Sequence, residues 1–121
     1  METEIPVRDV MTRPVITADA DLDILSAARK MASANVGSLI IVSGEKPAGI
    51  LTERDLVKKV LAQGIDPRTV KAEQVMSAPV VAIEPDASLR EAAVLMLRSG
   101  VKRLPVIFKG KLVGIITDTD L

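Results

Sequence analysis

The chain has no cysteine, histidine, tryptophan or tyrosine, and it has a single phenylalanine. Without cysteine it has no disulfide, no thiolate nucleophile and no thiolate metal ligand. Without histidine it lacks the commonest general base and metal ligand. The remaining carboxylates, lysines and hydroxyls form no catalytic cluster at matched spacing. The sequence therefore predicts that the protein is not an enzyme.

Charge and hydropathy exclude further classes of protein. Lys+Arg and Asp+Glu are both 16, so the formal net charge is zero. A nucleic-acid partner is not expected, since the chain lacks both a basic excess and aromatic stacking platforms. No apolar run approaches the roughly 18 residues of a membrane span, and the first residues do not resemble a signal peptide. We therefore expect a cytoplasmic protein without a membrane partner. Because aromatic residues make up only 1% of the chain, its core is expected to be aliphatic.

The chain contains an internal repeat. Residues 10–56 align with residues 75–121 without a gap, at a constant offset of 65 positions. A site that one copy builds is therefore expected to have a counterpart in the other. The sixteen identical pairs are Val10/Val75, Met11/Met76, Pro14/Pro79, Val15/Val80, Asp21/Asp86, Ala27/Ala92, Ala28/Ala93, Met31/Met96, Val36/Val101, Leu39/Leu104, Lys46/Lys111, Gly49/Gly114, Ile50/Ile115, Thr52/Thr117, Asp55/Asp120 and Leu56/Leu121.

Each copy has the same predicted order of elements. In the first copy an extended run is followed by an acidic helix start, an amphipathic helix, two strands and a second helix that ends at Gly64. Its strands are predicted at 14–17, 39–42 and 49–52, and its second helix at 53–63. In the second copy the strands are predicted at 79–83, 104–108 and 112–117, and the helix at 88–99. The prediction is an α/β (α+β) fold of two β-α-β-β-α repeats related by a pseudo-twofold axis.

The repeat also predicts the domain organisation. We expect the first repeat at 7–64, a connector at 65–74 and the second repeat at 75–121. The second copy stops where its last helix would begin, so that helix is expected to be missing or truncated. This implies that the native protein is longer or that the chain has been cut here.

The most specific short motif occurs twice, as Gly49-Ile-Leu-Thr-Glu-Arg-Asp55 and as Gly114-Ile-Ile-Thr-Asp-Thr-Asp120. In both, a strand ends at Thr and Asp follows three residues later, where a helix begins. A carboxylate there can accept both hydroxyls of a ribose, and the Thr hydroxyl with free helix N–H groups can bind a phosphate. The same spacing is close to a capping box. The residues alone leave both interpretations open.

A second acidic pattern has a simpler interpretation. Asp19, Asp21 and Asp23 alternate like the start of a calcium-binding loop. The sixth position of that loop would be Ile24 rather than Gly, and the twelfth Lys30 rather than Glu. We therefore predict a helix cap and no metal site.

Taken together, the motifs resemble a tandem pair of CBS domains, also called a Bateman module, over residues 7–121. The matching residues are Val10-Met11, Pro14 to Thr17, Val36 to Val42 and Gly49 to Leu56 in the first copy, and Val75-Met76, Pro85 to Leu89, Gly100 to Val106 and Gly114 to Leu121 in the second. The resemblance implies two three-stranded sheets packed with helices, and a cleft between the copies with two possible nucleotide sites. Members of the family bind AMP, ADP, ATP or S-adenosylmethionine as sensors rather than as catalysts.

The resemblance also implies which residues contact a ligand. Site one would use Thr17 and Ala18 beside the base, the backbone at Gly37 and Ser38, Thr52 for phosphate and Asp55 for ribose, with Arg54 able to serve either ligand. Site two would use Ala82, Ile83, Lys102, Arg103, Leu104, Pro105, Thr117 and Asp120. The copies differ where Lys102 and Arg103 replace Gly37 and Ser38, which favours site two for phosphate-bearing ligands. A solvated turn is the alternative for these two cations.

The function expected from the resemblance is a regulatory module that senses adenine nucleotides and passes a conformational change to an unidentified effector protein. No cofactor is required, and the nucleotide acts as a regulatory ligand. The alternatives are a structural dimerisation module without ligand and an S-adenosylmethionine sensor. A homodimer is predicted, because the apolar residues of the 88–99 helix cannot all face one small core. These residues are Leu89, Ala92, Ala93, Leu95, Met96 and Leu97.

Overall fold

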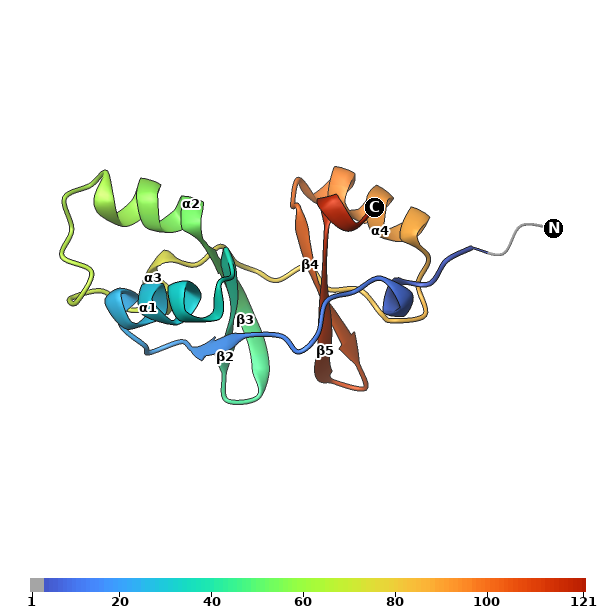
Figure 1. The fold of residues 1–121 in the computed structure, drawn as a ribbon, viewed down its shortest axis with the longest axis horizontal. Coiled ribbons are helices and arrows are strands. Elements are labelled where there is room, and N and C mark those ends of the chain that lie inside the picture. The colour runs from blue at the N-terminus through green and yellow to red at the C-terminus, as the bar shows by residue number, and fades with distance from the viewer. Residues whose placement is uncertain (1–3) are drawn as a thin grey trace. The chain divides into compact units, whose positions relative to one another are not determined.

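The computed structural model describes residues 4–121, which form two compact units (Figure 1). The first-repeat unit is Ile16–Val80. The second-repeat unit combines Val81–Leu121 with the N-terminal segment that ends at Val15. Each unit therefore contains residues that the sequence repeat assigns to the other copy or to the connector. The repeat predicted boundaries at 64 and 74, whereas the compact units divide at Val15/Ile16 and at Val80/Val81.

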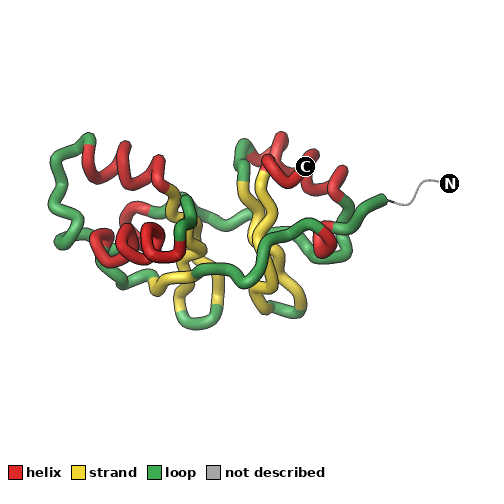
Figure 2. Tube along the Cα trace, viewed as in Figure 1, coloured by secondary structure: helices red, strands yellow, loops and turns green. Residues whose placement is uncertain are grey.

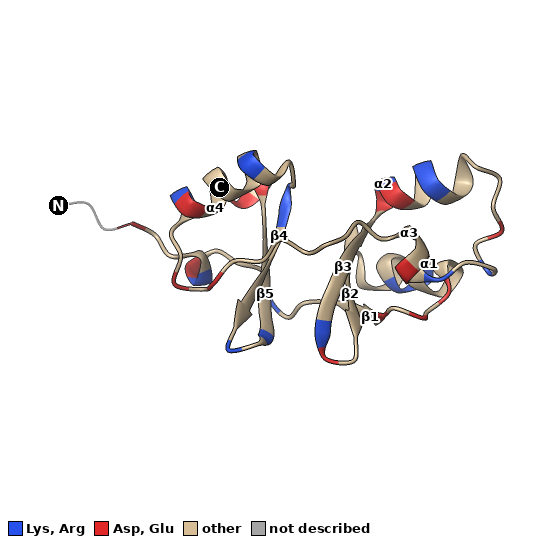
Figure 3. Cartoon of the chain, turned by 180° about the vertical axis from the view of Figure 1, so that it is seen from behind, with Lys and Arg blue, Asp and Glu red and all other residues tan. Residues whose placement is uncertain are grey.

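The first-repeat unit contains a three-stranded sheet in the order β1-β2-β3. Strand β1 is parallel to β2, and β2 is antiparallel to β3. Figures 1 and 3 show α1 and α2 on one face of this sheet. The elements are β1 (Thr17–Asp19), α1 (Ile24–Ala34), β2 (Ser38–Ser43), β3 (Lys46–Thr52), α2 (Glu53–Leu56), a π-helical turn η2 (Val57–Leu61) and α3 (Ala72–Val75). The predicted helix at 53–63 is thus α-helical only in its first turn.

Local chemistry accounts for the ends of α1. Asp23 is the N-cap, and its carboxylate accepts hydrogen bonds from Ser26 N at 3.0 Å and Ser26 Oγ at 2.7 Å. Asn35 ends the helix in the left-handed conformation, with φ 55°. The cap predicted within the alternating aspartates is therefore confirmed at Asp23. Inward-facing aliphatic side chains of α1 pack on the sheet to form the core, whose buried members are Ala18, Ile24, Ala27, Met31, Leu39, Ile41, Leu51, Val60, Ala72 and Val75.

The second-repeat unit has the same plan with a smaller sheet. Its elements are the 3-10 turn η1 (Val7–Asp9), α4 (Leu89–Ser99), β4 (Arg103–Phe108), β5 (Lys111–Thr117) and the 3-10 turn η3 (Asp118–Asp120). Strands β4 and β5 pair antiparallel. Figure 2 shows that the N-terminal segment is mostly loop with one short helical turn. The buried core consists of Val7, Ile83, Ala92, Met96, Leu104, Val106 and Ile116.

The predicted strand at 79–83 and the third strand implied for this sheet are wrong. Ile83 alone pairs with β4, through Ile83 N to Pro105 O at 3.0 Å and Ile107 N to Ile83 O at 2.9 Å. In the first-repeat unit the ladder extends further, through Ile40 N to Ile16 O and Ala20 N to Val42 O. The residues that match these two donors are Pro105 and Pro85. Proline has no N–H, so both outer bonds are lost and a single bridge remains.

In each unit the segment carrying a Val-Met pair lies along the last strand. Ser77 pairs with Ile50 on β3, and Thr12 pairs with Ile115 on β5. The methionine before each bridge packs over a glycine of the strand, so this segment is joined to the sheet by both backbone and side chain. Among the described residues, no helix is both long and apolar enough to cross a bilayer.

Candidate functional site

The residues predicted for site one meet at one end of the first sheet. Ser38 opens β2 and is paired with Thr52, the last residue of β3. Thr17 opens β1 two residues further along, opposite Ile40. Glu53 N donates to Gly37 O at 3.1 Å, which holds the start of α2 against the turn before β2. The register therefore brings Thr17, Ser38 and Thr52 to the same end of the sheet.

Thr52 and Asp55 form the capping box that was one of the two interpretations of the motif. Asp55 N donates to Thr52 Oγ1 at 3.2 Å, and Asp55 Oδ2 accepts from Thr52 N at 3.0 Å and Thr52 Oγ1 at 3.1 Å. The Asp55 residue is 7% exposed. The cap therefore holds the carboxylate by Oδ2, and this also fixes the direction in which Oδ1 points.

The second oxygen of Asp55 contacts two residues that the motif did not reveal. Lys59 Nζ lies 3.1 Å from Asp55 Oδ1, and Ser77 Oγ donates to the same oxygen at 3.4 Å. Lys59 Nζ also donates to Val75 O at 2.9 Å. The i,i+4 spacing of Asp55 and Lys59 is a sequence signal for such an ion pair. Ser77 carried no local signal, because it reaches Asp55 only through its pairing with β3.

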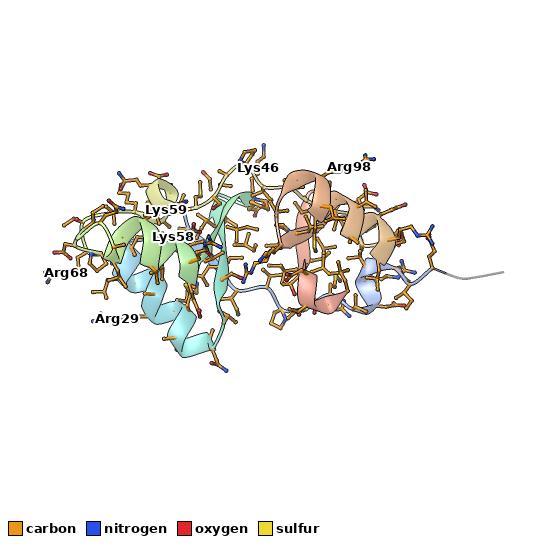
Figure 4. All side chains as sticks on the ribbon, turned by 90° about the horizontal axis from the view of Figure 1, so that it is seen from above. Arg29, Lys46, Lys58, Lys59, Arg68 and Arg98 are labelled. Atoms are coloured by element: carbon orange, nitrogen blue, oxygen red, sulfur yellow. The ribbon has the colours of Figure 1, made fainter. Side chains whose placement is uncertain are left out.

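The predicted cation of site one, Arg54, contacts none of these groups through an ion pair. Arg54 is exposed on α2 and takes part in none of the ion pairs found among residues 4–121. Figure 4 labels the neighbouring Lys58 and Lys59 on the helical segment that follows.

The second-repeat unit repeats the cap at its own strand end. Arg103 is paired with Thr117, as Ser38 is with Thr52. Asp120 Oδ2 accepts from Thr117 N at 2.7 Å and from Thr117 Oγ1 at 3.1 Å. Thr117 Oγ1 also lies 2.8 Å from Thr119 Oγ1. Oδ1 of Asp120 accepts no hydrogen bond from any described residue, and Asp120 is half-buried.

The two cations of site two flank this cap. Lys102 is exposed, Arg103 is half-buried at the start of β4, and Asp118 N donates to Lys102 O at 2.9 Å. Figure 3 shows basic residues at this end of β4. Leu104 and Pro105 are buried in the strand and can offer only backbone to a ligand at this point.

Two predicted members of site two line a different hollow. Ala82 and Ile83 face an open hollow of about 570 Å³ whose other walls are Glu84, Ala87, Ile107, Lys109 and Gly110. This hollow lies toward the hairpin between β4 and β5, whereas Thr117 and Asp120 lie at the opposite end of those strands. Within the second-repeat unit, the structure does not join the base-side and ribose-side residues in one cavity.

Comparison with known proteins settles the family of this architecture. The family model for the CBS domain matches residues 7–62 and again residues 72–121. The chain belongs to the CBS domain family. Its two matches make it a CBS pair, as the repeat and the motifs implied, and its mixed α+β fold is confirmed by solved CBS pairs.

Three related proteins illustrate the similarity. An uncharacterized protein of Methanopyrus kandleri is 42% identical over 119 residues, which cover 97% of this chain and 61% of that protein. A hexameric CBS-CP12 protein from bloom-forming cyanobacteria superposes with a TM-score of 0.90 at 30% identity, covering 98% of this chain and 67% of that one. A CBS domain pair solved with 5′-methylthioadenosine and S-adenosyl-L-methionine has a TM-score of 0.85 at 29% identity, covering 98% of this chain and 93% of that one.

Proposed function

We propose that this CBS pair is a regulatory module, without enzymatic activity of its own, that binds adenine nucleotides through Asp55 and Asp120. The observation that carries the proposal is the geometry of the repeated cap. In both units Thr and its own amide occupy Oδ2 of the acid, so capping and ligand binding use different oxygens. Oδ1 of Asp120 is thereby held in place as an acceptor for a ribose hydroxyl.

The related pair that was solved with 5′-methylthioadenosine and S-adenosyl-L-methionine supports an adenosine group as the recognised part of the ligand. The charges of site two favour a nucleotide over S-adenosylmethionine. Lys102 and Arg103 stand beside Thr117, where phosphate would gain charge-assisted hydrogen bonds and a sulfonium would be repelled. Binding would act on an effector protein by the difference in ligand affinity between two conformations of the module.

Titration calorimetry with AMP, ATP and S-adenosylmethionine tests the proposal. Asp120→Ala should weaken nucleotide binding by about 1.5–3 kcal/mol, the range for hydrogen bonds to a charged group. Asp118→Ala is the matched control, since Asp118 is exposed in the same turn and outside the cap. If Asp120→Ala lowers the melting temperature and leaves affinity unchanged, the acid is a cap alone.

The module is further proposed to act as a homodimer through its helices. On α4, Leu97 is 84% exposed and Val94 40% exposed, while Ala92 and Met96 of the same helix are buried. In the first-repeat unit, Leu61 is 66% exposed. Apolar side chains at such exposure on a 12.9 kDa chain are candidates for burial against another subunit.

Analytical ultracentrifugation at micromolar concentration should give the mass of a dimer. Leu97→Glu should shift it toward the monomer, whereas Ser99→Glu, which adds the same charge to the exposed end of α4, should not. A monomer mass for the unmodified chain would contradict the dimer, and so would a hexamer mass such as the cyanobacterial relative suggests.

A further inference from the structure

The carboxylate of Asp55 already has as many hydrogen-bond donors as it can accept. A carboxylate offers about four lone-pair positions, two on each oxygen. Thr52 supplies two donors to Oδ2, and Lys59 and Ser77 supply one each to Oδ1. A ribose diol that reaches Asp55 therefore has to displace donors that the protein itself provides.

The two donors on Oδ1 are the ones that a ligand can displace. The Thr52 contacts belong to the cap and are fixed by the strand end. By contrast, the Ser77 contact is long at 3.4 Å, and the Lys59 side chain is 45% exposed. The Asp55 side chain is only 9% exposed and must keep a partner, but water can solvate the Lys59 ammonium once a ligand hydroxyl has replaced it on Oδ1.

We propose that Ser77 and Lys59 are internal competitors for the ribose diol at Asp55. The Ser77 hydroxyl and the Lys59 ammonium fill the two acceptor positions of Oδ1 that a ribose hydroxyl would use. This inference rests on the proposed function, because it assumes that a diol binds Asp55. It makes ligand binding at site one break the contact between Asp55 and residues 75–77.

Asp120 lacks this competition in the described part of the chain. The residue that matches Ser77 is Thr12, and its backbone pairs with Ile115 just as Ser77 pairs with Ile50. The Thr12 side chain is exposed and donates no hydrogen bond to Asp120. The position that matches Lys59 falls after Leu121, so we compare Ser77 with Thr12 alone. At this matched position, Ser77 donates its hydroxyl to Asp55, whereas Thr12 donates none to Asp120.

The competition is also coupled to the path of the chain. Lys59 holds Asp55 Oδ1 and Val75 O at the same time, at 3.1 and 2.9 Å. Residues 75–77 lead directly into the segment that crosses from the first-repeat unit to the second at Val80/Val81. A ligand that binds Asp55 Oδ1 in place of Lys59 and Ser77 therefore breaks contacts that hold the segment joining the two units.

Adenosine and 2′-deoxyadenosine are the probes, because they differ by one ribose hydroxyl and carry no phosphate that Lys59 could attract. Binding is measured by calorimetry in the full chain carrying Asp120→Ala, so that site one dominates. Ser77→Ala should tighten adenosine binding about two- to fivefold. This is the lower part of the effect expected for one net hydrogen bond, because the contact from Ser77 Oγ to Asp55 Oδ1 is long. It should also increase the preference for adenosine over 2′-deoxyadenosine.

Lys59→Met keeps the apolar stem and should change adenosine binding in the same direction, with a lower melting temperature because Val75 O loses its donor. Lys58→Met and Thr12→Ala are matched controls. Lys58 is exposed and forms none of the ion pairs among residues 4–121, and Thr12 belongs to the other unit. Both controls should leave the binding of adenosine at site one unchanged.

The results separate this inference from the proposed function. A preference for adenosine that Asp55→Ala abolishes and Ser77→Ala leaves unchanged would keep the proposed function and overturn the competition. Weaker adenosine binding in Ser77→Ala would make Ser77 a ligand contact, and would also overturn it. Equal affinity for the two nucleosides in every variant would remove the diol contact at Asp55, and with it both this inference and the part of the proposed function that assigns a ligand to site one.

Discussion

Gly49 and Gly114 occupy matching positions in β3 and β5, and each lies under a methionine of the segment that pairs with its strand. A Cβ built on Gly49 would lie 2.5 Å from Met76 Sδ and 2.8 Å from the carbonyl oxygen of Ser77. A Cβ built on Gly114 would lie 2.5 Å from Met11 Sδ and 2.9 Å from Met11 Cγ. Neither site has room for alanine, but the obstacles differ: Gly49 meets backbone as well as side chain, and Gly114 meets side chain alone.

This difference sets the expected cost of each substitution. Overpacking a well-filled site costs about 1–3 kcal/mol, and a flexible methionine can relieve part of it by changing rotamer. The Ser77 carbonyl cannot move freely, because it accepts from Ile50 N at 3.0 Å while Ser77 N donates to Ile50 O at 2.9 Å. We expect about 2–3 kcal/mol for Gly49→Ala and about 1–2 kcal/mol for Gly114→Ala.

Urea unfolding followed by far-UV circular dichroism measures both costs, since the chain has no tryptophan to report by fluorescence. Double-mutant cycles with Met76→Ala and Met11→Ala then isolate the contacts. Removing the Met11 side chain should cancel most of the cost of Gly114→Ala. Removing the Met76 side chain should cancel only part of the cost of Gly49→Ala, since the Ser77 carbonyl remains. Equal rescue in the two cycles, or a neutral Gly49→Ala, would refute the packing argument.

Two further predictions concern charge. The hydrogen bonds from the Ser26 side chain and backbone lower the pKa of Asp23 below its ordinary value of 3.8. Stability from this cap is therefore fully present above pH 3.8 and is lost as the pH falls toward the lower pKa that Asp23 has in the folded state. The melting temperature of Asp23→Ala should therefore depend less on pH in this acid range than the melting temperature of Asp21→Ala does. In site two, Lys102→Ala combined with Arg103→Ala should reduce the preference for ATP over AMP and leave adenosine affinity unchanged, which calorimetry with the three ligands checks. Unchanged ratios would show that these two cations form a solvated turn.

The order of elements could be predicted because it depends on local chemistry that the repeat displays twice. Asp23 caps α1, Ser88 caps α4, and the strands end at the Thr residues of the two capping boxes. These signals lie within a few residues of the positions they control. The same is true of the turn at Lys109-Gly110, where both residues have positive φ.

What escaped prediction depends on contacts far apart in sequence. The N-terminal segment packs with the second repeat, through Val7 N to Ala87 O at 2.7 Å and Leu89 N to Ile5 O at 2.9 Å. No local pattern assigns a loop to a sheet that begins about 90 residues later in the chain. The shortened strand at Ile83 has a readable cause in Pro85 and Pro105, but its effect is visible only once the register of β4 is known.

The candidate sites show the same division between motif and surroundings. Thr52/Asp55 and Thr117/Asp120 are identical in residue type and spacing, and in both the acid accepts from the Thr amide and hydroxyl, so the motif alone does not distinguish the two sites. The structure places different neighbours around them: Ser77 and Lys59 on the first acid, and the basic start of β4 beside the second. The free energy of binding a diol depends on which donors it must displace, and the energy of binding a phosphate depends on the charges nearby. Under the proposed function, the duplicated motif therefore supplies two acceptors of one kind, and the residues outside the motif would give the two acceptors different ligand affinities. Such a difference would let one ligand occupy one site before the other.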